Sequence, residues 1–104
     1  MEYDNSMNEW STEDLNKIRL SAGKLTEEGT LFVPKSIEEK DGKNGQFWVV
    51  SGETPEGKPM DLTFSSMKLH KIFEDHWEQM VGQCVVLIGK GMGFDREYLV
   101  RKLV

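Results

Sequence analysis

Hydrophobic residues recur along the chain with two periods, one typical of helices and the other of strands. Near the N-terminus, Leu15, Ile18 and Ala22 follow a helical spacing. Ser11, which precedes them, is of a residue type that caps helix N-termini well. This pattern predicts a short amphipathic helix over residues 12–22.

After the first 28 residues the period falls to two, which indicates β-structure. Strands are predicted at residues 30–33, 46–50 and 60–65, with turn-rich segments at residues 41–45 and 54–57 between them. Pro34 predicts that the first strand is an edge or contains a bulge or early bend, before it resumes through Ile37. In the third strand Met60, Leu62 and Phe64 alternate with polar residues, so one face is expected to be buried.

A second amphipathic helix is predicted over residues 67–81, with Ser66 as its N-cap and Gly82 at its end. Its hydrophobic side, expected in the core, consists of Leu69, Ile72, Phe73, Trp77 and Met80. Two more strands follow. The one at residues 84–88 is apolar throughout and is expected to be buried on both faces, and the last is predicted at residues 98–104.

The order of these elements is typical of one known architecture. Three strands, a helix and two further strands are the order of the OB fold, a five-stranded antiparallel barrel whose helix lies between strands 3 and 4. Residues 29–104 therefore resemble an OB domain. Residues 1–28 would form an N-terminal extension with an acidic tail and the short helix. We expect a mainly β fold with a closed or nearly closed barrel.

A second resemblance is local to the C-terminal half. Trp77 is followed, from Gly82 to Val100, by the segment GQCVVLIGKGMGFDREYLV. This segment is similar to the C-terminal half of small phage and archaeal single-strand-binding-like proteins. Those proteins tend to have a Trp, a glycine-led apolar strand, a glycine-rich hairpin and a Tyr-x-Val strand in this order. The resemblance implies binding of single-stranded DNA.

The composition is that of one small domain with a modest core. The chain has 104 residues, of which 38% are hydrophobic, and no apolar run approaches the ~20 residues that a membrane-spanning helix needs. Residues 1–10 are polar and acidic, unlike a secretory signal peptide. Cys84 is the single cysteine, so an internal disulfide is excluded. These features together predict a cytoplasmic, intracellular location.

The net charge of −5 bears on function, because a nucleic-acid-binding domain is usually basic. The charge is unevenly distributed. Residues 1–40 carry nine acids against five bases, whereas residues 41–104 carry nine acids against eight bases. A nearly neutral body can still contain a local basic groove, so nucleic-acid binding is disfavoured but not excluded.

No catalytic, metal or cofactor site is predicted. Gly89, Gly91 and Gly93 lack the Lys-Ser/Thr pair and the following helix that phosphate-binding loops need, so they predict a hairpin. His70 and His76 lie six residues apart on the predicted helix and cannot face one metal ion. His76, within the apolar stripe, is expected to be a partly buried structural residue. The single cysteine lies in an apolar strand and is expected to act as a small hydrophobe.

Aromatic and basic residues on the predicted barrel form the candidate binding site. Phe47 and Trp48 are adjacent, so in a strand one of them faces outward. OB domains bind single strands across strands 2 and 3 and through the loops after strands 1 and 4, by base stacking on aromatic rings and by Lys and Arg contacts to phosphates. The predicted nucleic-acid-binding residues are Lys43, Trp48, Lys90, Phe94, Arg96, Tyr98 and Arg101.

We therefore expect the chain to bind single-stranded DNA or RNA with little sequence preference. The alternative is a protein–protein interaction module, for example a viral or replication-associated accessory subunit or an acidic mimic of DNA, which the negative charge favours. A positive surface with a bare aromatic ring on strands 2 and 3 would favour the first, and an acidic or apolar surface the second. The sequence leaves open the oligomeric state and the choice between DNA and RNA.

Overall fold

The computed structural model describes residues 17–103, and for Phe94 the backbone only. Six strands and one α-helix make up most of these residues. The strands are β1 (Ile18–Ser21), β2 (Thr30–Gly42), β3 (Gly45–Glu53), β4 (Pro59–Phe64), β5 (Val85–Lys90) and β6 (Glu97–Lys102). The α-helix is α2 (Met67–Met80), and two short 3-10 helices are η1 (Ala22–Lys24) and η2 (Gly93–Asp95).

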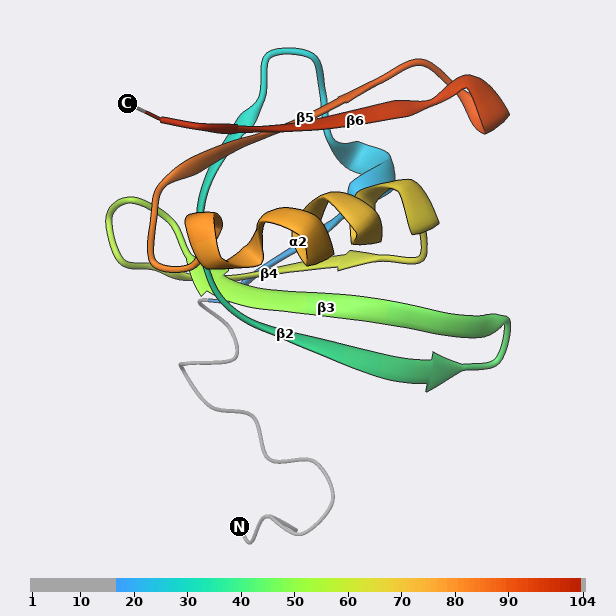
Figure 1. Ribbon diagram of the computed structural model, residues 1–104, viewed down its shortest axis with the longest axis horizontal. Helices are drawn as coiled ribbons and strands as arrows, with labels where there is room; N and C mark the ends of the chain where they lie inside the picture. The colour runs from blue at the N-terminus through green and yellow to red at the C-terminus, as the bar shows by residue number, and fades with distance from the viewer. Residues whose placement is uncertain (1–16, 104) are drawn as a thin grey trace, which may run out of the picture.

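The strands form one curled sheet in the order β1-β4-β3-β2-β5-β6, which makes a half-barrel. All neighbours are antiparallel except β1 and β4, which are parallel. In Figure 1, α2 lies between the β5–β6 ribbon and the part of the sheet that contains β2, β3 and β4. The predicted mainly β fold is confirmed. The predicted five-stranded barrel is not matched in detail, since the sheet has six strands and the helix lies between its fourth and fifth strands along the chain.

The additional strand is β1, and it corrects the predicted helix over residues 12–22. Residues 18–21 are extended and residues 22–24 form η1, while residues 12–16 lie outside the described part of the chain. Ile18 belongs to the predicted helical pattern, but together with Leu20 it also has a period of two. Paired in register with β4, they bury side chains and gain sheet hydrogen bonds, so tertiary pairing overrides the local helical spacing.

β2 changes its partner part of the way along its length. Its first residues, Thr30–Phe32, pair with β5, whereas the residues from Val33 to Gly42 pair with β3. The partner changes between Phe32 and Val33, and the register with β3 shifts between Pro34, which is fully buried, and Ser36. An irregularity here costs the sheet little, because proline has no N–H to donate. Of the alternatives predicted from Pro34, an edge is wrong, since β2 lies between β3 and β5, and an irregularity within the strand is what the structure shows.

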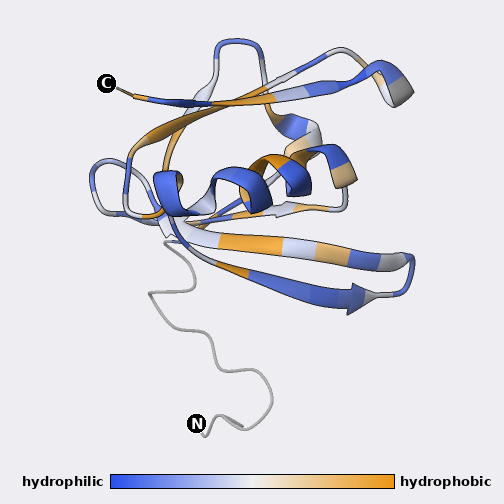
Figure 2. Ribbon diagram, viewed as in Figure 1, coloured by the Kyte–Doolittle hydropathy of each residue, from blue (hydrophilic) through white to orange (hydrophobic). Residues whose placement is uncertain are grey.

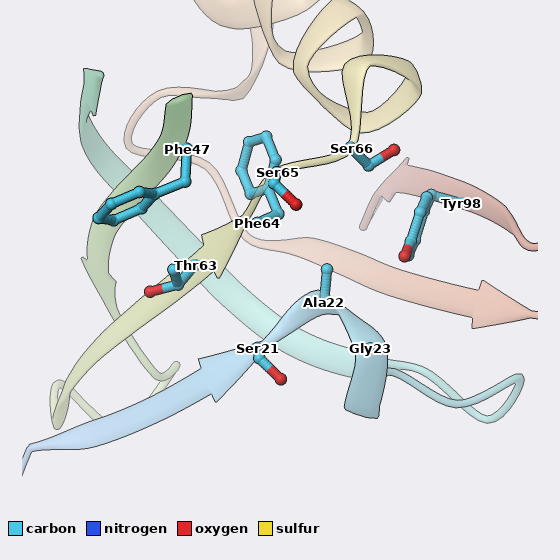
Figure 3. Close-up of a pocket in the computed structure, with 9 residues that line it drawn as sticks. All are labelled: Ser21, Ala22, Gly23, Phe47, Thr63, Phe64, Ser65, Ser66 and Tyr98. Carbon is cyan, nitrogen blue, oxygen red and sulfur yellow. The ribbon is translucent and has the colours of Figure 1, made fainter. Parts of the chain in front are cut away.

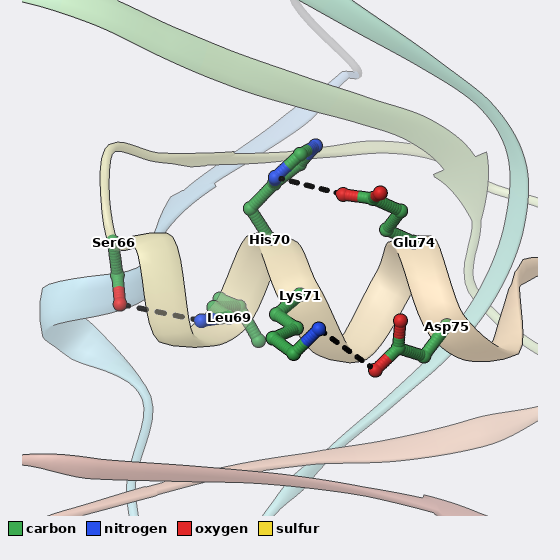
Figure 4. Close-up of polar contacts among 6 residues, drawn as sticks. All are labelled: Ser66, Leu69, His70, Lys71, Glu74 and Asp75. Carbon is green, nitrogen blue, oxygen red and sulfur yellow. Dashed lines mark hydrogen bonds and ion pairs between the residues drawn. The ribbon is translucent and has the colours of Figure 1, made fainter.

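Helix α2 begins and ends as the sequence predicts. The Ser66 Oγ accepts a hydrogen bond from the backbone N–H of Leu69 at 3.3 Å, and Lys71 and Asp75 form an ion pair one turn later (Figure 4). After Met80 the chain leaves the helix, and Gly82 adopts a φ of 76° that only glycine takes up easily. Ser66 before the helix and Gly82 after it therefore set the two ends of α2.

The sequence predicts that His76 is partly buried, but in the structure His70 is the partly buried histidine of α2. His76 is exposed, with its ring next to the Gln79 amide at 3.3 Å. His70 is half-buried and stacks on Trp48 with ring centroids 4.1 Å apart. The buried face of α2 therefore extends to His70 and not to His76, because the Trp48 ring from β3 packs against that side of the helix.

The core lies inside the curl, between α2 and the sheet. Its largest fully buried side chains include Phe32, Phe73, Leu62, Leu69 and Leu87. Trp77, expected in the core, is only partly buried at its margin. Figure 2 shows hydrophobic colour on the inner parts of the strands and hydrophilic colour at the end of the β2–β3 hairpin. No helix of the described residues is long and apolar enough to cross a membrane.

Candidate nucleic-acid interface

A hollow of 440 Å³ lies where the two ends of the curled sheet approach each other. It is lined by the end of β1 and the start of η1, by β3 and β4, by the start of α2 and by β6. Figure 3 shows Phe47 and Tyr98 on opposite sides of this hollow. The lining residues are Ser21, Ala22, Gly23, Phe47, Thr63, Phe64, Ser65, Ser66 and Tyr98.

Two smaller hollows adjoin the first one and share residues with it. A hollow of 200 Å³ contains Ser21 and Thr63 again and adds Arg19, Leu20 and Lys24. A hollow of 230 Å³ contains Ser66 and Tyr98 again and adds Lys68, Gly93 and Arg96. We call the three together the seam groove, since they follow the open seam of the half-barrel.

The lining of the seam groove has a distinct chemistry. Two aromatic rings, Phe47 and Tyr98, flank the central hollow, and serine and threonine hydroxyls lie between them. Basic side chains lie at both ends: Arg19 and Lys24 at one, Lys68 and Arg96 at the other. Among residues 17–103, which include 13 Asp and Glu, no acidic residue lines any of the three hollows.

One acid beside the seam groove is paired with a base. Asp61 lies on β4 opposite Arg19 in the parallel register, two residues before Thr63. Its carboxylate forms an ion pair with the Lys17 ammonium at 2.9 Å, and its side chain is 16% exposed. The negative charge of Asp61 is therefore neutralised by a neighbouring base.

Strand alternation explains how the central hollow obtains its side chains. Trp48 faces the core with an exposure of 5%, so the adjacent Phe47 faces outward, where it is half-buried. On β4, Phe64 is buried and Thr63 faces outward, opposite Ser21 in the register with β1. Outward positions of three neighbouring strands thus meet in one place.

Arg96 holds the other side of the seam groove in position. Its guanidinium donates to the backbone carbonyls of Ala22 (2.9 Å), Leu25 (2.7 Å) and Gly91 (3.0 Å) and to the Tyr98 hydroxyl (3.2 Å). It also lies 5.2 Å from the centre of the Tyr98 ring. Arg96 therefore links the β5–β6 loop to η1 and orients Tyr98.

The close packing around Arg96 also explains why position 89 is a glycine. A Cβ at Gly89 would lie 2.5 Å from the Arg96 Nη2 and 2.9 Å from the Leu25 Cβ. Only glycine leaves room for the guanidinium between β5 and the segment after η1. This glycine therefore has a packing role at the seam.

Arg96→Lys is expected to lower the free energy of unfolding by about 2 kcal/mol. An ammonium cannot reach the three carbonyls at once, and hydrogen bonds from charged groups contribute ~1.5–3 kcal/mol. Urea unfolding measures the change. Lys43→Arg, in the exposed β2–β3 turn, is the control and should change the value by less than about 0.5 kcal/mol. Equal effects of the two substitutions would refute the role of the guanidinium.

The structure brings two of the predicted binding residues, Arg96 and Tyr98, into the seam groove. Trp48 is buried in the core against His70 and Phe64, so its ring is not available to a ligand, and Phe47 takes the exposed position. The side chain of Phe94 lies outside the description.

The remaining three predicted residues lie elsewhere on the surface. Lys43 is in the turn at the end of the β2–β3 hairpin. Lys90 pairs with Glu97, and Arg101 follows three residues after Tyr98, so alternation places both on the opposite face of the sheet from Tyr98. None of the three lines the seam groove.

Besides the serine and threonine residues, sequence reasoning missed three bases and one aromatic ring of the seam groove: Arg19, Lys24, Lys68 and Phe47. Arg19 was assigned to a helix, and its place beside Thr63 depends on the pairing of β1 with β4. The signal for Phe47 was present, since one of two adjacent aromatic residues had to face outward. Nothing in the sequence marks Lys68 as a binding residue, because a lysine in the first turn of an amphipathic helix is common.

Other kinds of site are not found in residues 17–103. No three His, Cys, Asp or Glu side chains of this part of the chain are grouped to hold a metal ion. Cys84 is half-buried. Comparisons of the chain with known protein families, with curated proteins and with solved structures give no match.

Proposed function

We propose that this protein binds single-stranded nucleic acid along the seam groove, with little sequence preference. The observation that carries the proposal is the lining itself: two aromatic rings that flank a hydroxyl-rich hollow, bases at both ends and, within the described part of the chain, no acid. Unstacked bases pack on aromatic rings whatever their sequence, and Lys or Arg neutralises the phosphates. Serine and threonine hydroxyls both donate and accept hydrogen bonds, so they accommodate any base.

The distribution of charge is compatible with this proposal. The first 16 residues contain five acids and no Lys or Arg, which leaves 13 acids and 13 bases in residues 17–104. The net charge of −5 therefore comes from the N-terminal segment alone. A neutral body with four of its 13 bases in one groove can attract a polyanion locally.

The arrangement of strands supports the proposal in a second way. Along the chain, after β1, the elements β2, β3, β4, α2, β5 and β6 succeed one another as the elements of an OB domain do. OB domains bind single strands on the outward face of their second and third strands. β3 and β4 occupy those places here, and their outward residues include Phe47 and Thr63.

Phe47→Ala is expected to weaken binding of a fluorescently labelled oligothymidylate by roughly 5–150-fold, since one base–aromatic stack contributes ~1–3 kcal/mol. Fluorescence anisotropy at low salt measures the dissociation constant. Stacking releases no counterions, so the loss should be similar at every salt concentration. In the seam groove Arg19, Lys24 and Lys68 form no ion pair with any residue of 17–103, so for the unchanged protein log K should fall by about 2 per tenfold increase in salt.

A matched pair of lysines separates the seam groove from the rest of the surface. Lys24→Ala, within the groove, should reduce the salt slope by about one contact, whereas Lys43→Ala, in the β2–β3 turn, should leave it unchanged. The reverse result would place the binding site on the hairpin. A folded protein that binds no oligonucleotide at low salt would overturn the proposal and favour the interaction module.

A further inference from the structure

Among the residues that the structure describes, the sheet ends in a strand with an unpaired edge. In this part of the chain β6 is last in the strand order and pairs only with β5, antiparallel over Glu97–Lys102. Within residues 17–103, none of its residues makes a backbone hydrogen bond to any segment other than β5. Such an edge offers a row of N–H and C=O groups that another extended strand can pair with.

The residues along this edge have a self-complementary order. Alternation places Glu97, Leu99 and Arg101 on one face of β6, with Leu99 in the middle. Glu97 and Arg101 are exposed, and neither forms an ion pair with another residue of the described chain. One negative and one positive side chain thus lie at equal distances on either side of a hydrophobic residue.

From this arrangement we infer that β6 pairs antiparallel with β6 of a second copy of this chain, about a two-fold axis at Leu99. In a continuous antiparallel sheet, directly opposed residues lie on the same face, so Glu97, Leu99 and Arg101 can oppose only one another. The register that opposes the two Leu99 side chains places Glu97 opposite Arg101 at both ends. Beyond them it brings Arg96 opposite Lys102, but the Arg96 guanidinium is already held by backbone carbonyls of its own chain. A two-fold axis makes both contacts identical.

The other edge of the sheet does not permit the same pairing. β1 has only four residues, and it continues from Lys17. A two-fold register centred on Ile18 or Arg19 would place Lys17 against Arg19, or Arg19 against Arg19 of the second copy, and like charges directly opposed destabilise a strand pair. A register centred on Leu20 would oppose Arg19 to Ser21. Within residues 17–103, no register of β1 therefore opposes unlike charges, whereas the Leu99 register of β6 does so at both ends.

A pair of six-residue strands buries less area than stable dimers need, so the dimer is expected to be weak and dependent on concentration. Sedimentation equilibrium of the full chain over a wide concentration range tests this. The apparent mass should rise from 11.9 kDa towards twice that value as concentration increases. A mass of 11.9 kDa at every concentration up to the millimolar range would overturn the inference.

Charge reversal tests the register itself. Arg101→Glu should raise the dimer dissociation constant at least tenfold, because it opposes two carboxylates at each end of the strand pair. Adding Glu97→Arg to this variant should restore dimerisation. Lys43→Glu, which changes the net charge equally but lies in the β2–β3 turn, should have no such effect. A dimer that Arg101→Glu leaves intact, or that the double variant fails to restore while its melting temperature is unchanged, would refute this register. None of these results depends on nucleic-acid binding.

Discussion

Phe73→Ala is expected to lower the free energy of unfolding by about 3–5 kcal/mol, the usual cost of removing a large core side chain. Phe73 has no exposed surface and projects from the middle of α2. Its ring stacks on Phe64 with centroids 5.6 Å apart and meets Trp77 at 6.3 Å. The substitution would leave a cavity where helix and sheet meet, and this contact holds α2 inside the curl. Urea unfolding at fixed temperature measures the loss.

The control for this prediction is on the same helix. Met67→Ala truncates a side chain that is 68% exposed, so it should change the free energy of unfolding by less than about 0.5 kcal/mol. If Phe73→Ala costs no more than Met67→Ala does, α2 does not pack against β4 in the way described.

Gly52→Ala is expected to destabilise the fold by about 3 kcal/mol, at the upper end of the cost of overpacking a core. A Cβ at this position would lie 2.1 Å from the Val33 carbonyl oxygen and 3.0 Å from the Pro34 Cα. Both are backbone atoms at the bend of β2, so neither can move aside as a flexible side chain would. The bend lets one strand pair with both β3 and β5, and the half-barrel depends on it.

A second glycine serves as the control for Gly52. A Cβ at Gly23 would meet no atom within 4 Å, so Gly23→Ala should have little effect on the melting temperature. Thermal unfolding of the two variants compares them directly. A similarly small effect of Gly52→Ala would contradict the close approach of β3 to the bend in β2.

Several elements of the fold could be predicted because their signals are local. The stripe of α2 repeats every three to four residues and is bounded by Ser66 and Gly82, so the helix needs no knowledge of its neighbours. The alternation of Met60, Leu62 and Phe64 likewise defines β4. These patterns also placed β5 in the interior, where it pairs on both sides.

The other elements depend on partners that are distant in sequence. β1 is four residues long, and its extended conformation follows from pairing with β4 about 40 residues later. Arg96 was predicted to contact phosphate, and its sequence surroundings suit that role. In the structure its partners are carbonyls of Ala22 and Leu25, more than 70 residues away along the chain. A sequence cannot indicate which residues meet at the seam until the curl of the sheet is known.

The central claim is that the seam groove is the site of binding, and the most direct measurement is to map where an oligonucleotide contacts the protein. Uniformly ¹⁵N-labelled protein would be titrated with an oligothymidylate of about ten nucleotides at low salt, within the usual site size of one OB domain. We predict that the largest amide chemical-shift changes occur at Ser21, Thr63, Ser66 and Tyr98. Changes confined to the β2–β3 turn or to the face that carries Arg101, or no changes at all, would contradict the account.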